Sequence, residues 1–222
     1  MKELTIYHGS TNIVDKPRFL LGKKYNDYGQ GFYCTFDIEM AKEWACKENN
    51  NGFVNEYKIN LSDLKILDLT DKKYNILNWI AILLKNRKFE LQEQISRQAK
   101  EYLLENFLID TNEYDLIIGY RADDSYFSFA QSFVANSLSV RQLEKSFKLG
   151  QLGLQIALIS EKAFKNIVYI NSFYVSKDIY YSKYIHRDKS ARSYFFNIIK
   201  SEEFNENDIF VLDIMRKKMK NI

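Results

Sequence analysis

The sequence predicts an α+β protein, because segments with strand-like and helix-like periodicity occur in separate blocks. Short apolar or alternating runs fill the chain as far as residue 68, and apolar residues then recur at helical spacing from residue 72 to residue 107. Further short apolar runs follow, and the tail from residue 175 is mainly helical in pattern. A regular β–α–β alternation, which is typical of a parallel sheet, does not occur.

The predicted strands are short runs rich in β-branched and aromatic residues, separated by turn-forming residues such as those at 49–52 and 62–63. They are residues 4–7, 31–36, 53–61, 65–68, 115–120, 155–160 and 167–170. The first predicted helix, residues 39–47, follows Asp37, a residue type that caps helices well. The others are two helices within 72–107 separated near 86–88, a helix capped at Asp124, residues 140–147, a turn at 161–164, and the tail.

The chain of 222 residues contains no internal repeat and no linker rich in proline or glycine. We therefore expect one domain over residues 1–222, with a helical insertion at about 72–109 and a helical C-terminal extension at 175–222.

Composition argues against several classes of protein. The net charge of +3 is too small to indicate nucleic-acid binding by itself. Cys34 and Cys46 show neither metal-ligand spacing nor a disulfide framework, which favours a reducing, cytoplasmic setting. The N-terminus lacks the apolar segment of a signal peptide, and no apolar run reaches the roughly 18 residues of a membrane span. We therefore expect neither export by a standard signal nor membrane insertion.

Two short motifs carry the functional prediction. The first is His8-Gly9-Ser10, at the end of the first predicted strand. The second is GQGFY at residues 29–33, and Trp44 follows its tyrosine by eleven residues. Their order and spacing resemble the ADP-ribosyltransferase superfamily, in the branch of diphtheria toxin and the poly(ADP-ribose) polymerases. The stretches YHGS, GFY, ADD and QI…SEK are also similar to an uncharacterised bacterial family within that superfamily.

The resemblance implies a split β-sandwich fold and NAD as a substrate, without a metal. It implies that Tyr33 and Trp44 sandwich the nicotinamide ring, while a neutral His8 in one fixed tautomer bonds ribose hydroxyls. The backbone of Gly9 would pair with the carboxamide, where a side chain would collide. The full set of cofactor-binding residues that we expect is His8, Gly9, Ser10, Gly31, Tyr33, Trp44, Arg121 and Asp124.

Each of these residues also has a purely structural interpretation. A single histidine at a strand end often only satisfies neighbouring backbone groups, the two aromatic rings can be core residues, and the glycines can serve a turn. The joint spacing favours the NAD site.

The third signature residue of the superfamily is a glutamate ahead of a late apolar strand, and Gln155 stands at that position. Glutamine can keep the hydrogen bond to the ribose but carries no charge, so we expect transfer of single ADP-ribose units rather than polymer synthesis. Together with Tyr33 and His8, Gln155 is the predicted catalytic set. Glu161 is the alternative carboxylate, although a helix-start position explains it better.

Asp123 and Asp124 can cap a helix, or one of them can face the ribose or the acceptor as a general base. Arg121 can bind the phosphates of NAD. A nucleophilic pair of Cys34 and His8 has no support from spacing, because Cys34 should face away from the Tyr33 ring.

The expected function is therefore a mono-ADP-ribosyltransferase that modifies a protein, RNA or DNA in the cytoplasm. It could serve as the toxin of a toxin–antitoxin or phage-defence module, with an antitoxin protein as a further partner. Two alternatives are a catalytically weak NAD- or ADP-ribose-binding module and a protein-interaction domain that docks through the helices of residues 72–107.

The tail supplies basic residues that could follow a nucleic-acid backbone while tyrosines stack on bases. Those of its first half are Lys183, His186, Arg187, Lys189 and Arg192. A solvated helical face with a partner-binding seam explains them equally well.

Overall fold

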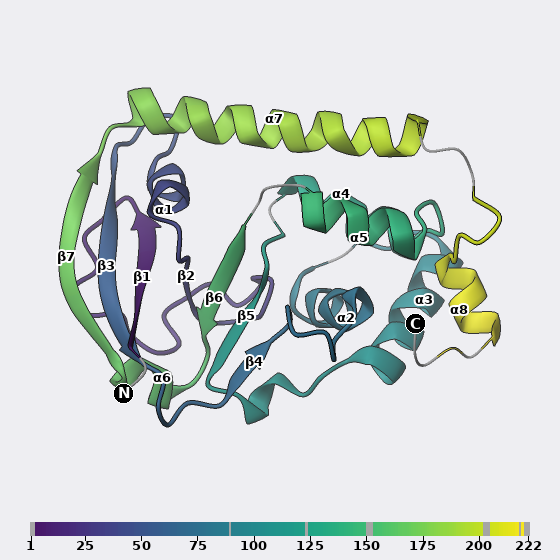
Figure 1. Cartoon of the computed structure of the whole chain (residues 1–222), viewed down its shortest axis with the longest axis horizontal. Helices are drawn as coiled ribbons and strands as arrows, with labels where there is room; N and C mark the ends of the chain where they lie inside the picture. The colour runs from purple at the N-terminus through teal and green to yellow at the C-terminus, as the bar shows by residue number, and fades with distance from the viewer. Residues whose placement is uncertain are drawn as a thin grey trace.

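The strands form two sheets, in a computed structural model that describes residues 3–88, 90–122, 124–149, 153–201, 205–217 and 219 (Figure 1). One is fully antiparallel, in the order β1 (Glu3–Ser10), β3 (Gly52–Asn60) and β7 (Ile167–Val175). The other has the order β2 (Phe32–Cys34), β6 (Leu154–Leu158), β5 (Leu116–Tyr120) and β4 (Ile66–Asp68), and only β4 and β5 pair in parallel. The predicted α+β class is confirmed.

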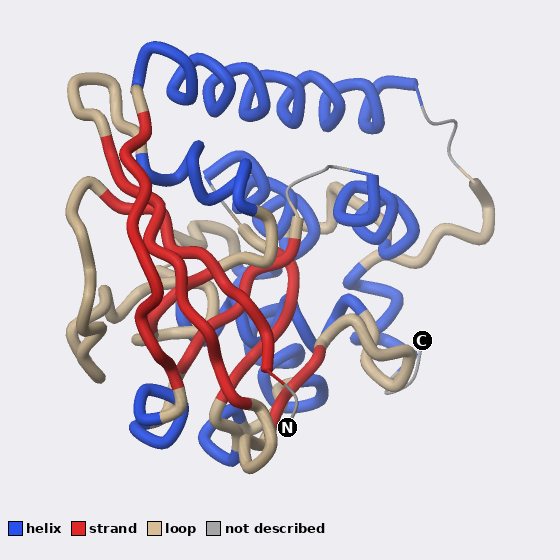
Figure 2. The backbone as a smooth tube through the Cα atoms, turned by 60° about the vertical axis from the view of Figure 1, so that its left-hand side comes forward, coloured by secondary structure: helices blue, strands red, loops and turns tan. Residues whose placement is uncertain are grey.

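Helices cover the open side of the four-stranded sheet and one end of both sheets (Figures 1 and 2). They are α1 (Ile38–Ala45), α2 (Ile76–Asn86), α3 (Gln94–Phe107), the 3₁₀ turn Thr111–Glu113, α4 (Asp124–Val134), α5 (Val140–Leu149), α6 (Glu161–Lys165), α7 (Lys177–Ser201) and α8 (Val211–Lys217). The long helix α7 runs across the top of the molecule and contacts α1, α4 and α5.

The strand predicted at 31–36 divides between the two sheets. Residues 32–34 pair with β6, whereas Thr35 forms a bridge to Tyr7 of β1 through two backbone hydrogen bonds of 2.8 and 2.9 Å. The chain therefore passes from one sheet to the other immediately after Cys34. The strand predicted at 4–7 continues to Ser10, because β1 pairs with β3 from Glu3 to Ser10.

One apolar cluster lies between the sheets and a larger one lies among the helices. Ile6, Tyr57 and Ile156 belong to the cluster between the sheets, and all are at most 1% exposed. The larger cluster includes almost every side chain of α2, among them Trp79 at 1% exposure. The helical segment expected as an insertion at about 72–109 is thus the centre of the largest core, which explains why most of the α2 surface is apolar.

Helix α1 is fixed at its N-terminus by a cap and farther along by an ion pair. The Asp37 side chain accepts hydrogen bonds from the backbone N–H groups of Glu39 and Met40, as its predicted capping role requires. On its other side, Glu43 forms a two-bond ion pair with Arg187 of α7, with both N···O distances at 2.8 Å. This anchoring positions Trp44, which α1 carries.

Candidate functional site

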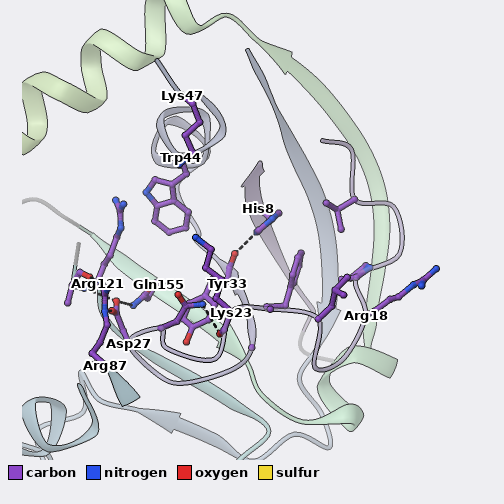
Figure 3. A pocket seen from close by; sticks show the side chains of 18 of the residues that line it. His8, Arg18, Lys23, Asp27, Tyr33, Trp44, Lys47, Arg87, Arg121 and Gln155 are labelled. Atoms are coloured by element: carbon purple, nitrogen blue, oxygen red, sulfur yellow. Dashed lines mark hydrogen bonds and ion pairs between the residues drawn. The ribbon is translucent and has the colours of Figure 1, made fainter. Parts of the chain in front are cut away.

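A cavity of about 550 Å³ opens between the loop of residues 11–31, strands β1, β2 and β6, and helix α1 (Figure 3). Small-molecule and cofactor sites commonly have volumes of about 300–1,000 Å³. The residues singled out in the sequence that line this cavity are His8, Gly31, Tyr33, Trp44, Arg121 and Gln155. They lie as far apart in the chain as positions 8 and 155, so tertiary folding brings them together.

His8 stands at the end of the inner face of β1, two residues after the buried Ile6. Its Nδ1 lies 2.7 Å from the backbone oxygen of Tyr33. Because a carbonyl oxygen only accepts, Nδ1 carries the hydrogen and Nε2 keeps a free lone pair. Burial lowers the pKa of His8 from its usual value, and the hydrogen bond to the Tyr33 carbonyl opposes that shift only in part. His8 therefore presents a neutral imidazole in one tautomer.

Tyr33 is held at both its hydroxyl and its ring. The hydroxyl donates to the Gly29 oxygen at 2.6 Å and accepts from the backbone N–H of Tyr28 at 3.1 Å. One ring face stacks on Tyr28, at a centroid distance of 6.5 Å and an interplanar angle of 13°. Burial, assisted by the nearby charge of Asp27, raises the pKa of Tyr33 far above its usual value. Tyr33 is thus a fixed neutral ring rather than an acid–base group.

Trp44 reaches the cavity from α1, whereas Tyr33 reaches it from β2 (Figure 3). Among the described residues, the Trp44 ring stacks on no other aromatic ring, but the guanidinium of Arg121 lies 4.7 Å from its centroid. Its Nε1 is buried and has no hydrogen-bond partner in the described part of the chain. The rings of Tyr33 and Trp44 therefore do not contact each other.

Gln155 contacts Asp27, and Asp27 is paired with Arg87; the sequence singled out neither of these two residues. Its Nε2 donates to Asp27 Oδ2 at 2.7 Å. Asp27 is only 5% exposed and also accepts from Arg87 Nε at 2.8 Å and from the Ala122 backbone N–H at 2.8 Å. Asp27 stands directly before the YGQGFY stretch, and that proximity was the only signal in the sequence; nothing in it pointed to Arg87.

The wall of the cavity is strongly cationic. Among the described residues it contains one carboxylate, Asp27, and the cations Lys16, Arg18, Lys23, Lys47, Arg87 and Arg121. Arg87 is paired with Asp27. The four lysine and arginine side chains at positions 16, 18, 23 and 47 form no ion pair with a described residue. Such a wall suits an anionic ligand.

Several residues from the sequence analysis lie outside this cavity wall. Gly9 packs under α1, where an added Cβ would come within 2.0 Å of the Ala41 oxygen. A side chain at position 9 would therefore collide with helix α1, whereas the sequence analysis expected it to collide with the carboxamide of NAD. Ser10 bonds the backbone of Asn12 at the exposed surface. Asp123 and the Asp124 side chain lie outside the described residues.

The alternative acidic and nucleophilic residues also lie elsewhere. Glu161 pairs with Lys165 at 2.9 Å, and its side chain is 66% exposed. Glu161 lines a different cavity, with Tyr28 and Ser160. Cys34 is fully buried between the sheets, where burial raises the pKa of its thiol. Neither residue can take the place of Gln155 at this site.

Part of the basic tail is committed to carboxylates of the chain itself. Lys183 pairs with Glu39 at 3.6 Å, Arg187 with the buried Glu43, and Arg192 with Asp188 at 2.9 Å. These pairs reduce the positive charge that α7 can offer to a nucleic-acid backbone.

A family model for proteins of unknown function, DUF3990, matches residues 4–169, about three quarters of the chain. The chain belongs to this family. Searches against curated proteins and against solved structures found no match.

The DUF3990 match runs from β1 into β7 and includes every described residue of the cavity wall except Tyr184. Tyr184 belongs to α7, which follows the matched region. Across the described residues, no helix has the length and apolar character of a membrane span. No group of three or more His, Cys, Asp and Glu side chains there has the arrangement of a metal site.

Proposed function

We propose that this DUF3990 protein is a mono-ADP-ribosyltransferase that uses NAD. The observation that carries the proposal is the convergence of His8, Tyr33, Trp44 and Gln155 on one cavity. The sequence resemblance implies a role toward NAD for each of these residues, independently of where they lie in space. Three of the four come from different strands and one from a helix.

The geometry suits each part of the dinucleotide. The nicotinamide ring would enter between Tyr33, whose other face is backed by Tyr28, and Trp44, which does not touch Tyr33. The free Nε2 lone pair of His8 would accept a hydrogen bond from a ribose hydroxyl. The cations of the wall, Arg121 among them, would neutralise the pyrophosphate.

The arrangement of the sheets supports the same proposal. The resemblance implies a split β-sandwich, and the chain has a three-stranded and a four-stranded sheet joined by the bridge between Tyr7 and Thr35. The site lies where the chain crosses from one sheet to the other, next to Tyr33. His8 on one sheet and Tyr33 on the other therefore meet at a single hydrogen bond.

In the proposed reaction a nucleophile of the acceptor forms a bond to C1 of the nicotinamide ribose. The bond from C1 to nicotinamide breaks, its electron pair leaves with nicotinamide, and the proton of the nucleophile passes to solvent. The protein contributes mainly by holding the ribose and the departing ring in position. The acceptor would be a protein or a nucleic acid of the cytoplasm, and the setting a toxin–antitoxin or phage-defence module.

The test is incubation with NAD labelled in the adenylate portion, with separate pools of protein, RNA and DNA and a parallel assay of released nicotinamide. We expect label in one pool and an equal amount of nicotinamide, and we expect His8→Ala and Tyr33→Ala to abolish both. Matched controls are His186→Ala, the other histidine, and Tyr174→Ala, a tyrosine that is 65% exposed on β7. Both controls should react as the wild type does.

A second candidate is a module that binds NAD or ADP-ribose without turnover. The uncharged Gln155 favours it, because the side chain at the position of the superfamily's glutamate then carries no negative charge. Calorimetric binding of NAD without release of nicotinamide would select this candidate. Absence of binding would reject both candidates.

A further inference from the structure

We infer that Asp27 is a positioning residue that orients the Gln155 amide and strengthens its carbonyl oxygen as an acceptor for the substrate. The inference rests on the proposed function, and it explains how a site with glutamine in place of glutamate could act on the ribose. Asp27 and Gln155 lie 128 positions apart in the chain and meet in the cavity wall (Figure 3).

Asp27 is held rigidly from three directions. Its Oδ1 accepts from Arg87 Nε at 2.8 Å. Its Oδ2 accepts from the Ala122 backbone N–H at 2.8 Å and from Gln155 Nε2 at 2.7 Å. Arg87 also donates to the Ala122 oxygen, so the same short segment after β5 holds both members of the ion pair. A carboxylate fixed in this way offers Gln155 an acceptor in a constant position.

The contacts of Gln155 decide which way its amide points. Nε2 faces two acceptors, Asp27 Oδ2 at 2.7 Å and the Tyr120 backbone oxygen at 3.3 Å. The flipped amide would place Oε1 against two oxygen atoms that carry no hydrogen, which is unfavourable. The Tyr28 hydroxyl also interacts with the Gln155 side chain, but it donates its hydrogen to the Tyr120 oxygen at 2.7 Å. Gln155 Oε1 therefore has no hydrogen-bond donor among the described residues, and it is not among the buried, unpartnered polar atoms. This oxygen is therefore free to accept from a ligand in the cavity.

The charge of Asp27 also acts on that oxygen. An amide whose N–H donates to a carboxylate becomes polarised, and its carbonyl oxygen gains negative character. Because both residues are at most 5% exposed, this effect is stronger than it would be in water. Asp27, which donates no hydrogen but accepts one from the Gln155 amide in the same cavity wall, thus supplies part of the electrostatic stabilisation that a glutamate would supply directly.

The experiment compares the wild type with Asp27→Asn and with the exchanged pair Asp27→Asn/Gln155→Glu, measuring kcat and KM for nicotinamide release. Asp27→Asn confronts the Gln155 N–H with a group that can itself donate, so the amide loses its fixed orientation. We expect kcat to fall about 10-fold or more with KM changed by less than about 3-fold, as for supporting residues behind a reactive group.

The exchanged pair restores one carboxylate, one amide and one hydrogen bond in the opposite direction. We expect it to recover at least the wild-type kcat, because the carboxylate now faces the ribose. Gln155→Glu alone should have a lower kcat than the exchanged pair. The introduced carboxylate would lie beside the Asp27 carboxylate, and the two would share a proton. If the role of Asp27 were purely structural, kcat would fall equally in Asp27→Asn and in Asp27→Asn/Gln155→Glu, and KM would change as well. That result, or an unchanged kcat in Asp27→Asn, would overturn the inference.

Two additions keep the test decisive. If Asp27→Asn does not fold, Asp27→Asn/Arg87→Gln removes both charges and leaves no unpaired buried cation. Exchange of the Gln155 side-chain amide protons with solvent, measured by NMR, reports whether the amide is held in place and does not require catalytic turnover. We expect protection in the wild type and its loss in Asp27→Asn. A wild type without nicotinamide release would reject the proposed function, while protection retained in Asp27→Asn would reject the role of Asp27.

Discussion

At the scale of single residues, His8 shows how a strand end prepares a side chain for binding. Its Nδ1 is committed to the Tyr33 carbonyl at 2.7 Å, and burial lowers the pKa of the imidazole. The result is a neutral ring whose remaining nitrogen only accepts. A ribose hydroxyl is the kind of donor that such a nitrogen can bind.

The pKa shift of His8 leads to a pH prediction. Because the folded-state pKa is lowered, His8 stays neutral from pH 8 down to its usual value of 6.5 and becomes protonated only at lower pH. We expect KM for NAD in nicotinamide release to be constant over that range and to rise below it. The unfolded chain takes up the proton first as pH falls, so the free energy of unfolding should also decrease below about pH 6.5. A KM that improves on acidification would contradict this.

Gly9 permits the closest contact between β1 and α1. A Cβ at this position would lie 2.0 Å from the Ala41 oxygen, 2.7 Å from the Ala45 nitrogen and 2.9 Å from the Trp44 Cβ. Gly9→Ala should therefore push α1 away and lower the free energy of unfolding by about 1–3 kcal/mol.

Urea denaturation followed by circular dichroism measures that cost. Ser10→Ala is the neighbouring control and should change stability by less than about 1 kcal/mol, since Ser10 bonds the local backbone of Asn12 and accepts only a long bond, 3.5 Å, from the side-chain amide of Asn55. Equal stability of Gly9→Ala and the wild type would show that α1 can move away without loss.

At the scale of elements, α1 and α7 form one unit beside the cavity. The ion pair between Glu43 and Arg187 joins them, and the Glu43 side chain is 6% exposed. Trp44 on α1 and Tyr184 on α7 both line the cavity. The position of α7 therefore affects the shape of the site.

Removing Arg187 should release this unit. Arg187→Ala leaves the carboxylate of Glu43 buried without its two-bond partner, and we expect a loss of about 2 kcal/mol or more in the free energy of unfolding. Arg192→Ala, which removes an exposed pair on the same helix, should cost less than about 1 kcal/mol. Chemical denaturation measures the free energy of unfolding of the two variants and of the wild type. Arg187→Ala/Glu43→Gln should regain part of the loss, and failure to do so would show that the ion pair is not the cause.

At the scale of the whole molecule, the region beyond the family match completes the core. Ala191 of α7 and Val211 and Ile214 of α8 are at most 4% exposed and belong to the largest apolar cluster, together with α2. The tail predicted as an extension thus shields residues that the matched region, 4–169, would leave uncovered.

A chain that ends at residue 176 should therefore fold poorly. Deleting α7 and α8 uncovers the faces of α3, α4 and α5 against which they pack, and it removes Arg187 from Glu43. We expect the shortened chain to lose cooperative thermal unfolding and to be cleaved by protease much faster than the full chain. A sharp transition at the wild-type melting temperature would show that the matched region folds alone.

Local periodicity in the sequence was enough to locate most strands and helices. The N-cap Asp37 and the helical periodicity within residues 72–107 could be recognised, because capping and the spacing of apolar residues act over a few neighbouring residues. The spacing from His8 to Trp44 likewise identified candidate residues that the structure places in one cavity. Gly9 was attributed to a ligand contact, because nothing local shows that α1 lies against it.

Other features depended on contacts between distant parts of the chain. The division of residues 31–36 between two sheets, the ion pair of Asp27 with Arg87, and the bond from Gln155 to Asp27 each join segments whose proximity no local pattern encodes. The sequence alone determined which chemical groups the protein possesses and which segments become strands or helices. Tertiary structure decided which groups face one another, because pairing between sheets and burial of charge are settled only when the whole chain packs.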